Sequence, residues 1–344
     1  MRVLITGASG FLGAHLARAH VAAGDDVIAL RHSKPLPSDL SGRVEELRGD
    51  LHEVNPATWP RGSVVYHCAA VMADQLDAPY EAFKRINVEG TAHILRASRA
   101  AKAERVVHVS SVGVLGPTRV PTTESAPYGR CLTNYERSKM EAEGVAHAAM
   151  REGLPVVIVR PAQLYGPGMR HMWPRLIQGI ARGRMPIVGR GTARIHLTHV
   201  EDVIQGLRLA ATMPRAVGQV YHLAAASPIT VRQAFESIAE ALGVPRPRTV
   251  PLWPLLAAAT ILERFPAAWR PGWLKIMTRH YVTFFTRDHV YAIEKAKAEL
   301  GYRPTQTWER TIVSTVAWYQ QEEHRRQQVA GDPQVAVGAS EVVA

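Results

Sequence analysis

A tyrosine and a lysine four residues apart form the first candidate for chemistry in this 344-residue chain. Residues 135–139 read YERSK, so a helix would place Tyr135 and Lys139 on one face, about one turn apart. A phenol with its ordinary pKa of about 10 is a poor base at neutral pH. A neighbouring ammonium would stabilise the phenolate and lower that pKa, so the pair is a candidate for general acid–base chemistry. The same spacing also occurs on solvated helices, so the pair needs support from its surroundings.

Two small hydroxyl side chains precede this pair in the run HVSSVGVLG (108–116), which follows an apolar strand pattern. Such hydroxyls at the carboxyl end of a parallel strand lie where doubly wound enzymes bind their ligands. We expect Ser111 to hold a substrate oxygen by a hydrogen bond while Tyr135 gives or takes its proton. Ser110 is a candidate beside the cofactor, and it equally fits a role in capping the strand end.

A glycine-rich turn, TGASGFLG (6–13), stands between the first strand pattern and the first helix pattern. In its GxxGxxG spacing one glycine makes the tight turn, one lets backbone approach a pyrophosphate, and one lets the helix pack closely on the strand. The start of the helix adds free N–H groups and positive dipole potential for the anion. The turn residues that we expect to contact a dinucleotide are Gly7, Ser9, Gly10, Phe11, Leu12 and Gly13.

The residue after the second strand pattern bears on which dinucleotide is bound. An NAD site usually has an acidic residue there, hydrogen-bonded to the ribose hydroxyls, but this chain has Arg31. A guanidinium would instead pair with a 2′-phosphate. The sequence therefore favours NADP(H) over NAD(H), unless Arg31 is only a solvated residue at the start of a loop.

Short apolar runs alternate with helical patterns through the first half of the chain, which predicts an α/β fold with a doubly wound parallel (Rossmann) sheet. The expected strands are residues 2–6, 26–30, 44–48, 64–67, 105–110 and 155–160. The expected helices between them are residues 10–23, 79–102 and 134–152. These elements assign residues 1–160 to a dinucleotide-binding core and bring the glycine turn, Ser111 and Tyr135 to one sheet edge.

The second half of the chain predicts a smaller, mostly helical substrate lobe over residues 161–320. A run at 219–224 is expected to return to the sheet as a strand. The expected helices are residues 200–212, 230–242, 252–265, 288–300 and 307–320. Residues 321–344 have mixed polarity without periodicity and are expected to form a flexible tail.

Taken together and in this order, the motifs TGASGFLG, HCAA (67–70), NVEGT (87–91), SSVGVLG, YERSK and RPAQLYGPG resemble the extended short-chain dehydrogenase/reductase family. The similarity runs from residue 1 to about 320. It implies the serine, tyrosine and lysine roles for Ser111, Tyr135 and Lys139, with Lys139 also binding the nicotinamide ribose. The further cofactor-site residues that it implies are Asp50 and Leu51 at the adenine, Ala69 and Ala70 along the dinucleotide, Asn87 steadying the site, and Pro161 beside the nicotinamide.

That family carries out two chemistries on one site: alcohol–ketone interconversion, and epimerisation or dehydration of sugar nucleotides. Large apolar and aromatic residues gather between residues 251 and 285, which suits a bulky apolar substrate of steroid, flavonoid or β-keto acyl type. They fit a lobe core or a dimer contact as well. The segment looks most like the corresponding region of 3β-hydroxysteroid dehydrogenase-like, sterol dehydrogenase and dihydroflavonol reductase-like members. Arginines and a lysine among these residues make 251–285 a candidate for peripheral contact with anionic lipid.

Two alternatives stay open. In GRGTARIHLTHVEDV (189–203), Arg194 would face the diphosphate of a sugar nucleotide if the protein were an epimerase or dehydratase with tightly bound NAD. A dinucleotide-binding protein without catalysis is the other alternative, although such a protein commonly loses the tyrosine or the lysine, and both are present here.

Composition narrows the class of protein. The chain is 47% hydrophobic and 21% charged, as expected for an ordinary folded protein. Its net charge is +11, but the basic residues are scattered singly, so nucleic-acid binding is not expected. Cys68 and Cys131 lack CxxC spacing, and no metal-ligand spacing is present. We expect a cytoplasmic homodimer, paired through helices 79–102 and 134–152, that works without a metal.

Overall fold

The computed structural model describes residues 1–53, 55, 59–72, 78–118, 120–170, 172–262, 264–265 and 278–330. Seven strands form one sheet in the order β11-β6-β5-β4-β1-β2-β3, and every neighbouring pair is parallel. The strands are β1 Arg2–Thr6, β2 Asp26–Arg31, β3 Glu45–Arg48, β4 Val64–His67, β5 Arg105–Val109, β6 Val156–Pro161 and β11 Val220–Leu223. This arrangement confirms the predicted doubly wound sheet.

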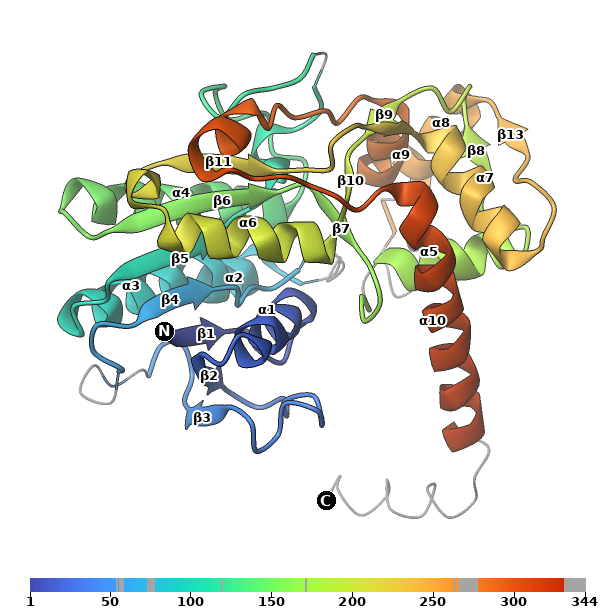
Figure 1. Ribbon diagram of the computed structural model, residues 1–344. Coiled ribbons are helices and arrows are strands. Elements are labelled where there is room, and N and C mark those ends of the chain that lie inside the picture. The colour runs from blue at the N-terminus through green and yellow to red at the C-terminus, as the bar shows by residue number, and fades with distance from the viewer. Residues whose placement is uncertain are drawn as a thin grey trace.

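Helices cover both faces of this sheet (Figure 1). On one face lie α1 (Phe11–Ala22) and α6 (Val200–Thr212), which pack apolar residues such as Leu16 and Leu207 on the strands. On the other lie α3 (Gly90–Ala100) and α4 (Asn134–Arg151), through residues such as Ile94 and Ala146. Because both faces are covered, the central strands are apolar at successive positions rather than alternately apolar and polar.

The order of the strands reverses between β1 and β4, since β1 continues to β2 on one side while β4 continues to β5 on the other. In open α/β sheets, ligands bind in the crevice at the carboxyl ends of the strands where this reversal occurs. The glycine turn follows β1 and Ser111 follows β5, so both lie at this edge of the sheet.

The predicted helix at 79–102 contains a local irregularity. It consists of α2 (Tyr80–Phe83), a π-helical turn at Lys84–Glu89 and α3. Asn87, a predicted site residue, is buried within the π turn. Such turns are rare and often occur at functional sites.

The lobe has its own apolar core, formed by α5 (Met172–Ala181), α7 (Val231–Leu242) and the first part of α10 (Trp308–Ala330). Two further helices, α8 (Leu252–Leu262) and α9 (Arg279–Thr286), pack against each other at its outer end (Figure 1). Short strand pairs that the sequence did not predict join its loops. They are β7 Gln163–Tyr165 with β10 Leu197–His199, β9 Arg194–Ile195 with β12 Ile229–Thr230, and β8 Ile187–Val188 with β13 Thr249–Val250.

Two predictions about the second half were wrong. The expected helix at 288–300 begins only at residue 294, because residues 289–293 lie extended, and bridges join His289 to Ile195 and Tyr291 to Thr122. The tail expected from residue 321 is helical up to Ala330, as the end of α10. Some of the aromatic and basic residues that the sequence groups at 251–285 lie outside the described residues, namely Trp269, Arg270, Trp273 and Lys275. The same holds for residues 331–344. Within the described part of the chain, no helix has the length and apolar character that crossing a membrane requires.

Candidate active site

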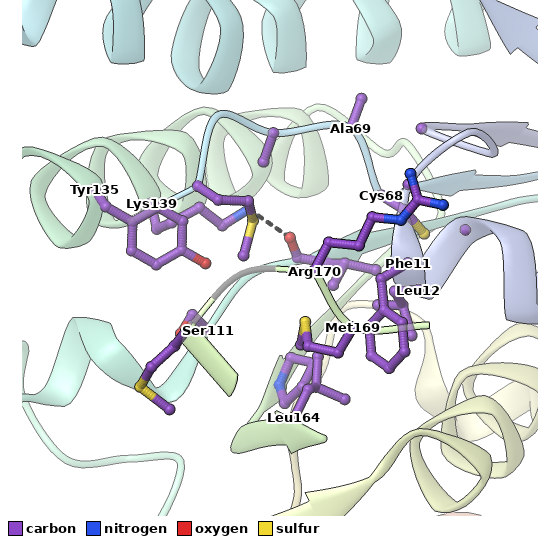
Figure 2. Close-up of a pocket in the computed structure, with 18 of the residues that line it drawn as sticks. Phe11, Leu12, Cys68, Ala69, Ser111, Tyr135, Lys139, Leu164, Met169 and Arg170 are labelled. Carbon is purple, nitrogen blue, oxygen red and sulfur yellow. Dashed lines mark hydrogen bonds between the residues drawn. The ribbon is translucent and has the colours of Figure 1, made fainter. Parts of the chain in front are cut away.

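A cavity of about 1270 Å³ runs along the carboxyl edge of the sheet and continues under the lobe. It is lined by every predicted catalytic and cofactor residue except Arg31 and Asn87. Figure 2 shows Ser111, Tyr135 and Lys139 on one side of it and Phe11, Leu12 and Arg170 on the other. Segments far apart in sequence therefore meet around one continuous space.

The glycine turn leaves no room for side chains. A Cβ on Gly7 would lie 2.8 Å from the backbone nitrogen of Ala69, and Gly7 has a positive φ of 74°. A Cβ on Gly13 would clash with the carbonyl of Gly7. No side chain caps the first turn of α1, and that turn holds no acidic residue. Its N–H groups can therefore serve a phosphate, so the chain's own geometry fits a dinucleotide.

The start of α4 decides where Tyr135 lies. Thr133 accepts a hydrogen bond from the backbone N–H of Glu136 at 3.1 Å, and Glu136 accepts one from the backbone N–H of Thr133 at 3.1 Å. This capping box begins the helix just before Tyr135. The tyrosine consequently occupies the first turn of α4, at the mouth of the sheet edge.

Ser111 and Tyr135 line the same part of the cavity (Figure 2). The Oγ of Ser111 accepts the backbone N–H of Gly113 at 3.0 Å, which caps a 3-10 turn at Val112–Leu115. Burial raises the pKa of Tyr135 to about 12, and the Ser111 hydroxyl, as a hydrogen-bond donor, opposes this rise. Desolvation is the largest cause of this rise and acts against the stabilisation of the phenolate that we expect from Lys139. The phenol is accordingly a proton donor over the whole physiological range.

Lys139 is buried, at 4% exposure, and donates a hydrogen bond of 2.6 Å to the carbonyl oxygen of Val109. Burial lowers the pKa of Lys139 to about 8, while the Glu143 carboxylate one turn further along α4 acts in the opposite direction. Glu143 is itself held by Arg160, at 2.8 and 2.7 Å. A positive charge is thus kept at the end of β5 in a site of low polarity.

The two predicted residues outside the cavity wall have other contacts. Arg31 pairs with Glu46 of β3 at 2.6 Å, so its guanidinium does not line the cavity. Asn87 accepts the backbone N–H of Val71 at 2.7 Å and donates to the backbone oxygen of Val71 at 3.1 Å and to Ser138 at 2.8 Å. It therefore joins the loop after β4, which carries Ala69 and Ala70, to α4 beside Lys139.

The end of β2 reaches the cavity through residues that the sequence analysis did not single out. His32, Ser33 and Lys34 line the wall there, together with Asp50 and Leu51 at the end of β3. Hydrogen bonding by the backbone N–H of His52 lowers the pKa of Asp50, so this carboxylate is an acceptor at neutral pH.

The lobe end of the cavity is mostly apolar. The side chains with large apolar surfaces that line it are Leu164, Met169, Met172, Trp173, Tyr281 and Phe284. Among the described residues after 160, Arg170 is the one arginine or lysine in this wall. The aromatic residues that the sequence grouped together at 251–285 are separated here, because Phe284 lines the cavity, Phe285 belongs to the lobe core and Trp253 is exposed.

At the lobe end of the cavity, residues 194–196 and residues 288–291 contact each other. Arg194 pairs with Asp288 through its side chain, at 2.6 and 2.9 Å, and does not line the cavity. His196 Nδ1 accepts the backbone N–H of Tyr291 at 3.1 Å. Burial lowers the pKa of His196 to about 4, so the ring is neutral and its proton is on Nε2. Sequence reasoning noted the motif around Arg194 but missed His196 and Tyr291, whose partners are about 95 residues away.

The chain is similar in sequence to several known proteins. The sequence profile of the NAD dependent epimerase/dehydratase family matches residues 3–225. A 2-alkyl-3-oxoalkanoate reductase of Stenotrophomonas maltophilia (strain K279a) is 28% identical, covering 88% of this chain and 95% of the relative. The 4-hydroxy-2-methyl-3-oxo-4-farnesyl-3,4-dihydroquinoline-1-oxide ketoreductase of Stigmatella aurantiaca is 31% identical, with 88% and 92% covered.

A 3 beta-hydroxysteroid dehydrogenase/Delta 5-->4-isomerase of Mycobacterium tuberculosis (strain ATCC 25618 / H37Rv) is 27% identical over 92% of this chain and 90% of the relative. Among solved structures, MoeE5 in complex with UDP-glucose and NAD has a TM-score of 0.75 and 28% identity, covering 94% of this chain and 99% of that one. These matches confirm the resemblance to extended short-chain dehydrogenases/reductases, and the chain belongs to the NAD dependent epimerase/dehydratase family.

Proposed function

We propose that this protein is an NADP(H)-dependent oxidoreductase that interconverts a secondary alcohol and a ketone on a bulky, largely apolar substrate. One observation carries the proposal: Ser111, Tyr135 and Lys139 line a single cavity together with the glycine turn, and that cavity ends in an apolar wall. The names of the two ketoreductase relatives and of the hydroxysteroid dehydrogenase relative support the same class of reaction.

Each of the three residues has a separate task in ketone reduction. The hydroxyl of Ser111 orients the ketone oxygen, and Tyr135 Oη gives that oxygen its proton as the carbon–oxygen double bond becomes a single bond. The Lys139 ammonium stabilises the phenolate left on Tyr135 and lies where it can bind ribose hydroxyls. A bound nicotinamide dinucleotide would supply the hydride to the carbon, or accept it in the oxidative direction.

Support for NADP(H) comes from the wall at the end of β2. His32, Ser33 and Lys34 line this wall, and its carboxylate, Asp50, follows β3 rather than β2 and lies 3.5 Å from His32 Nε2. A 2′-phosphate is stabilised by cationic and hydroxyl groups and would be repelled by an acidic residue at that point. Lys34 is therefore the first candidate for the 2′-phosphate contact, with Arg31 as a second if it leaves Glu46.

Support for an apolar substrate comes from the lobe. A sugar nucleotide needs several converging groups for its diphosphate, whereas Arg194 is occupied by Asp288 and, among the described residues after 160, Arg170 is the one arginine or lysine in that wall. The MoeE5 likeness keeps a sugar-nucleotide enzyme as the rival. Such an enzyme holds its dinucleotide tightly through a cycle without net redox change.

His196 is the polar group that we propose for recognising a second oxygen of the substrate. Its Nε2–H is a donor, because Nδ1 is occupied by Tyr291, and the residue lines the cavity. A donor among mostly apolar side chains orients a substrate without demanding that it be charged.

The deciding experiment is a spectrophotometric screen of the purified protein with NADPH and NADH against ketosteroids, flavanonols, β-keto acyl compounds and UDP-sugars. We expect reduced nicotinamide to be consumed with one of the apolar ketones. Purified protein that retains NAD and converts a UDP-sugar without net redox change would contradict the proposal and support the rival.

A further inference from the structure

Helix α8, with the sequence LWPLLAAATIL, carries no charged residue, and it exposes large apolar side chains on the side that faces away from the protein. Its exposed positions are 253, 257, 260 and 261, which recur at helical spacing and form one stripe. Trp253 is 75% exposed and Ile261 58%, and Trp253 is the most exposed large apolar side chain among the described residues. Since the outer face of a surface helix is normally polar, this stripe implies a partner.

Positive charge borders the stripe. Arg246 and Arg248 precede α8 and Arg264 follows it, and all three are exposed. Arg246 lies 3.8 Å from Glu236, and in the sequence Glu240 and Glu263 are the nearest acidic residues on either side of α8, which itself carries none. An apolar stripe flanked by arginines complements an anionic lipid surface, with acyl chains for the stripe and phosphates for the guanidinium groups. A second copy of the chain would bring the same positive charge and repel it.

The position of α8 also connects it to the cavity. It packs against α9, and Tyr281, Thr283 and Phe284 of α9 line the cavity wall. Figure 1 places both helices at the outer end of the lobe, away from β1–β3 and from the α3 and α4 helices expected at a dimer contact. The helix with the exposed apolar stripe therefore lies directly behind the apolar wall of the cavity.

We propose that the lobe docks on an anionic lipid bilayer through the outer stripe of α8, with Trp253 and Ile261 in the interface and Arg248 and Arg264 on lipid phosphates. The evidence for docking is the exposure of the apolar stripe on α8 and the positive charge of the arginines beside it. Its consequence, that an apolar substrate is taken up from the bilayer, rests on the proposed function.

The test uses the full chain and vesicles of phosphatidylcholine alone or mixed with phosphatidylglycerol, followed by co-sedimentation. We expect binding to the mixed vesicles that weakens as salt is added, and little binding to phosphatidylcholine alone. The double substitution Trp253→Gln with Ile261→Gln should lower partitioning about tenfold or more. Val313→Gln is the matched control, because Val313 is equally exposed, at 59%, but lies on α10.

Arg248→Gln with Arg264→Gln should weaken binding to the mixed vesicles. No binding to those vesicles, or binding that the double α8 substitution leaves unchanged, would overturn the proposal. The protein could instead form a concentration-dependent dimer, fail to bind vesicles, and dissociate when Trp253 and Ile261 are both replaced by Gln. That result would assign the stripe to self-association and would also overturn the proposal. The double α8 variant should reduce a water-soluble ketone at the wild-type rate, so loss of docking and failure of the proposed function give different results.

Discussion

Lys139 Nζ donates a hydrogen bond of 2.6 Å to the carbonyl oxygen of Val109, which holds the ammonium at the end of β5, one helical turn from Tyr135. The contact depends on two elements of different kinds, a buried strand and a capped helix. The strand ends where its carbonyl accepts the ammonium, and the capping box of Thr133 and Glu136 fixes the residue at which α4 begins. Helix and strand together therefore bring an ammonium, a phenol and a hydroxyl to one place.

Replacing Tyr135 by Phe removes the hydroxyl that exchanges a proton with the substrate oxygen. We expect kcat for ketone reduction to fall about 100-fold or more, with dinucleotide affinity essentially unchanged. Steady-state kinetics and a fluorescence titration with NADPH measure the two quantities. Tyr80→Phe, at a tyrosine outside the cavity wall, should keep full activity. A Tyr135→Phe enzyme with near-normal kcat would show that the proton comes from elsewhere.

The pH dependence of ketone reduction should follow the charge on Lys139. Burial lowers the pKa of Lys139 to about 8 and raises the pKa of Tyr135 to about 12. The phenol stays protonated throughout, whereas the ammonium is present below about pH 8 and is lost above it. We expect kcat/KM for reduction to be level below that pH and to fall above it. Lys139→Met should lower kcat/KM below pH 8 and remove its decrease above that pH. A wild-type kcat/KM that stays constant up to about pH 10 would contradict the assignment of this decrease to Lys139.

Gly13→Ala tests the glycine turn. The new Cβ would meet the carbonyl group of Gly7, with the carbonyl carbon at 2.7 Å, so backbone must shift. We expect loss of dinucleotide binding and a lower free energy of unfolding, by about 1–3 kcal/mol. Gly144→Ala in α4 is the control, since nothing lies within 4 Å of its added Cβ, and it should be neutral or slightly stabilising. Calorimetric titration with the dinucleotide measures binding by both variants, and thermal unfolding measures their stability. A Gly13→Ala variant that binds the dinucleotide as well as Gly144→Ala does would contradict the role of the glycine turn.

Nucleotide preference separates the contributions of Lys34 and Arg31. Lys34 lines the cavity and Arg31 pairs with Glu46, so Lys34→Ala should raise KM for NADPH and leave KM for NADH unchanged. Loss of a phosphate contact is worth about tenfold in affinity. Arg31→Asp should shift the preference toward NADH if Arg31 exchanges Glu46 for the 2′-phosphate. Equal kcat/KM for the two nucleotides in the wild-type enzyme would contradict the preference for NADP(H).

His196 should affect substrate binding more than turnover. His196→Leu removes the Nε2–H donor, and we expect KM for the ketone to rise about tenfold while kcat changes less. His196→Gln restores a donor near the same position and should recover part of this loss. Thermal unfolding of both variants controls for the lost contact with the backbone N–H of Tyr291. A KM that does not respond to either substitution would exclude His196 from substrate recognition.

Much of the site lies within short stretches of sequence. The strand, three glycines and helix start of the phosphate turn span only residues 2–13. Gly10 and Gly13 are restricted by contacts within that turn, and Gly7 has a positive φ and also approaches the residues that follow β4. The face shared by Tyr135 and Lys139 follows from four residues of helix. Apolar runs buried on both faces indicated the parallel sheet. These features depend on local backbone geometry, so the sequence was enough to predict them.

Other features depended on contacts between distant segments. Arg31 was predicted to face the cofactor, but Glu46, on the neighbouring strand, pairs with its guanidinium. Residues 289–293 have a helical pattern yet lie extended, because they pair with residues 195 and 122 instead. The 251–285 segment looked uniform in composition, but packing put Phe284 in the cavity, Phe285 in the core and Trp253 on the surface.

The parallel sheet, the phosphate turn and the Tyr135–Lys139 pair could be predicted from the sequence, because local periodicity and turn geometry are properties of a few consecutive residues. The charges that face the cavity, the protonation of His196 and the exposure of particular apolar residues could not. Those properties come from burial and from partners up to about 95 residues away, such as Tyr291 for His196, and burial is a property of the packed chain as a whole.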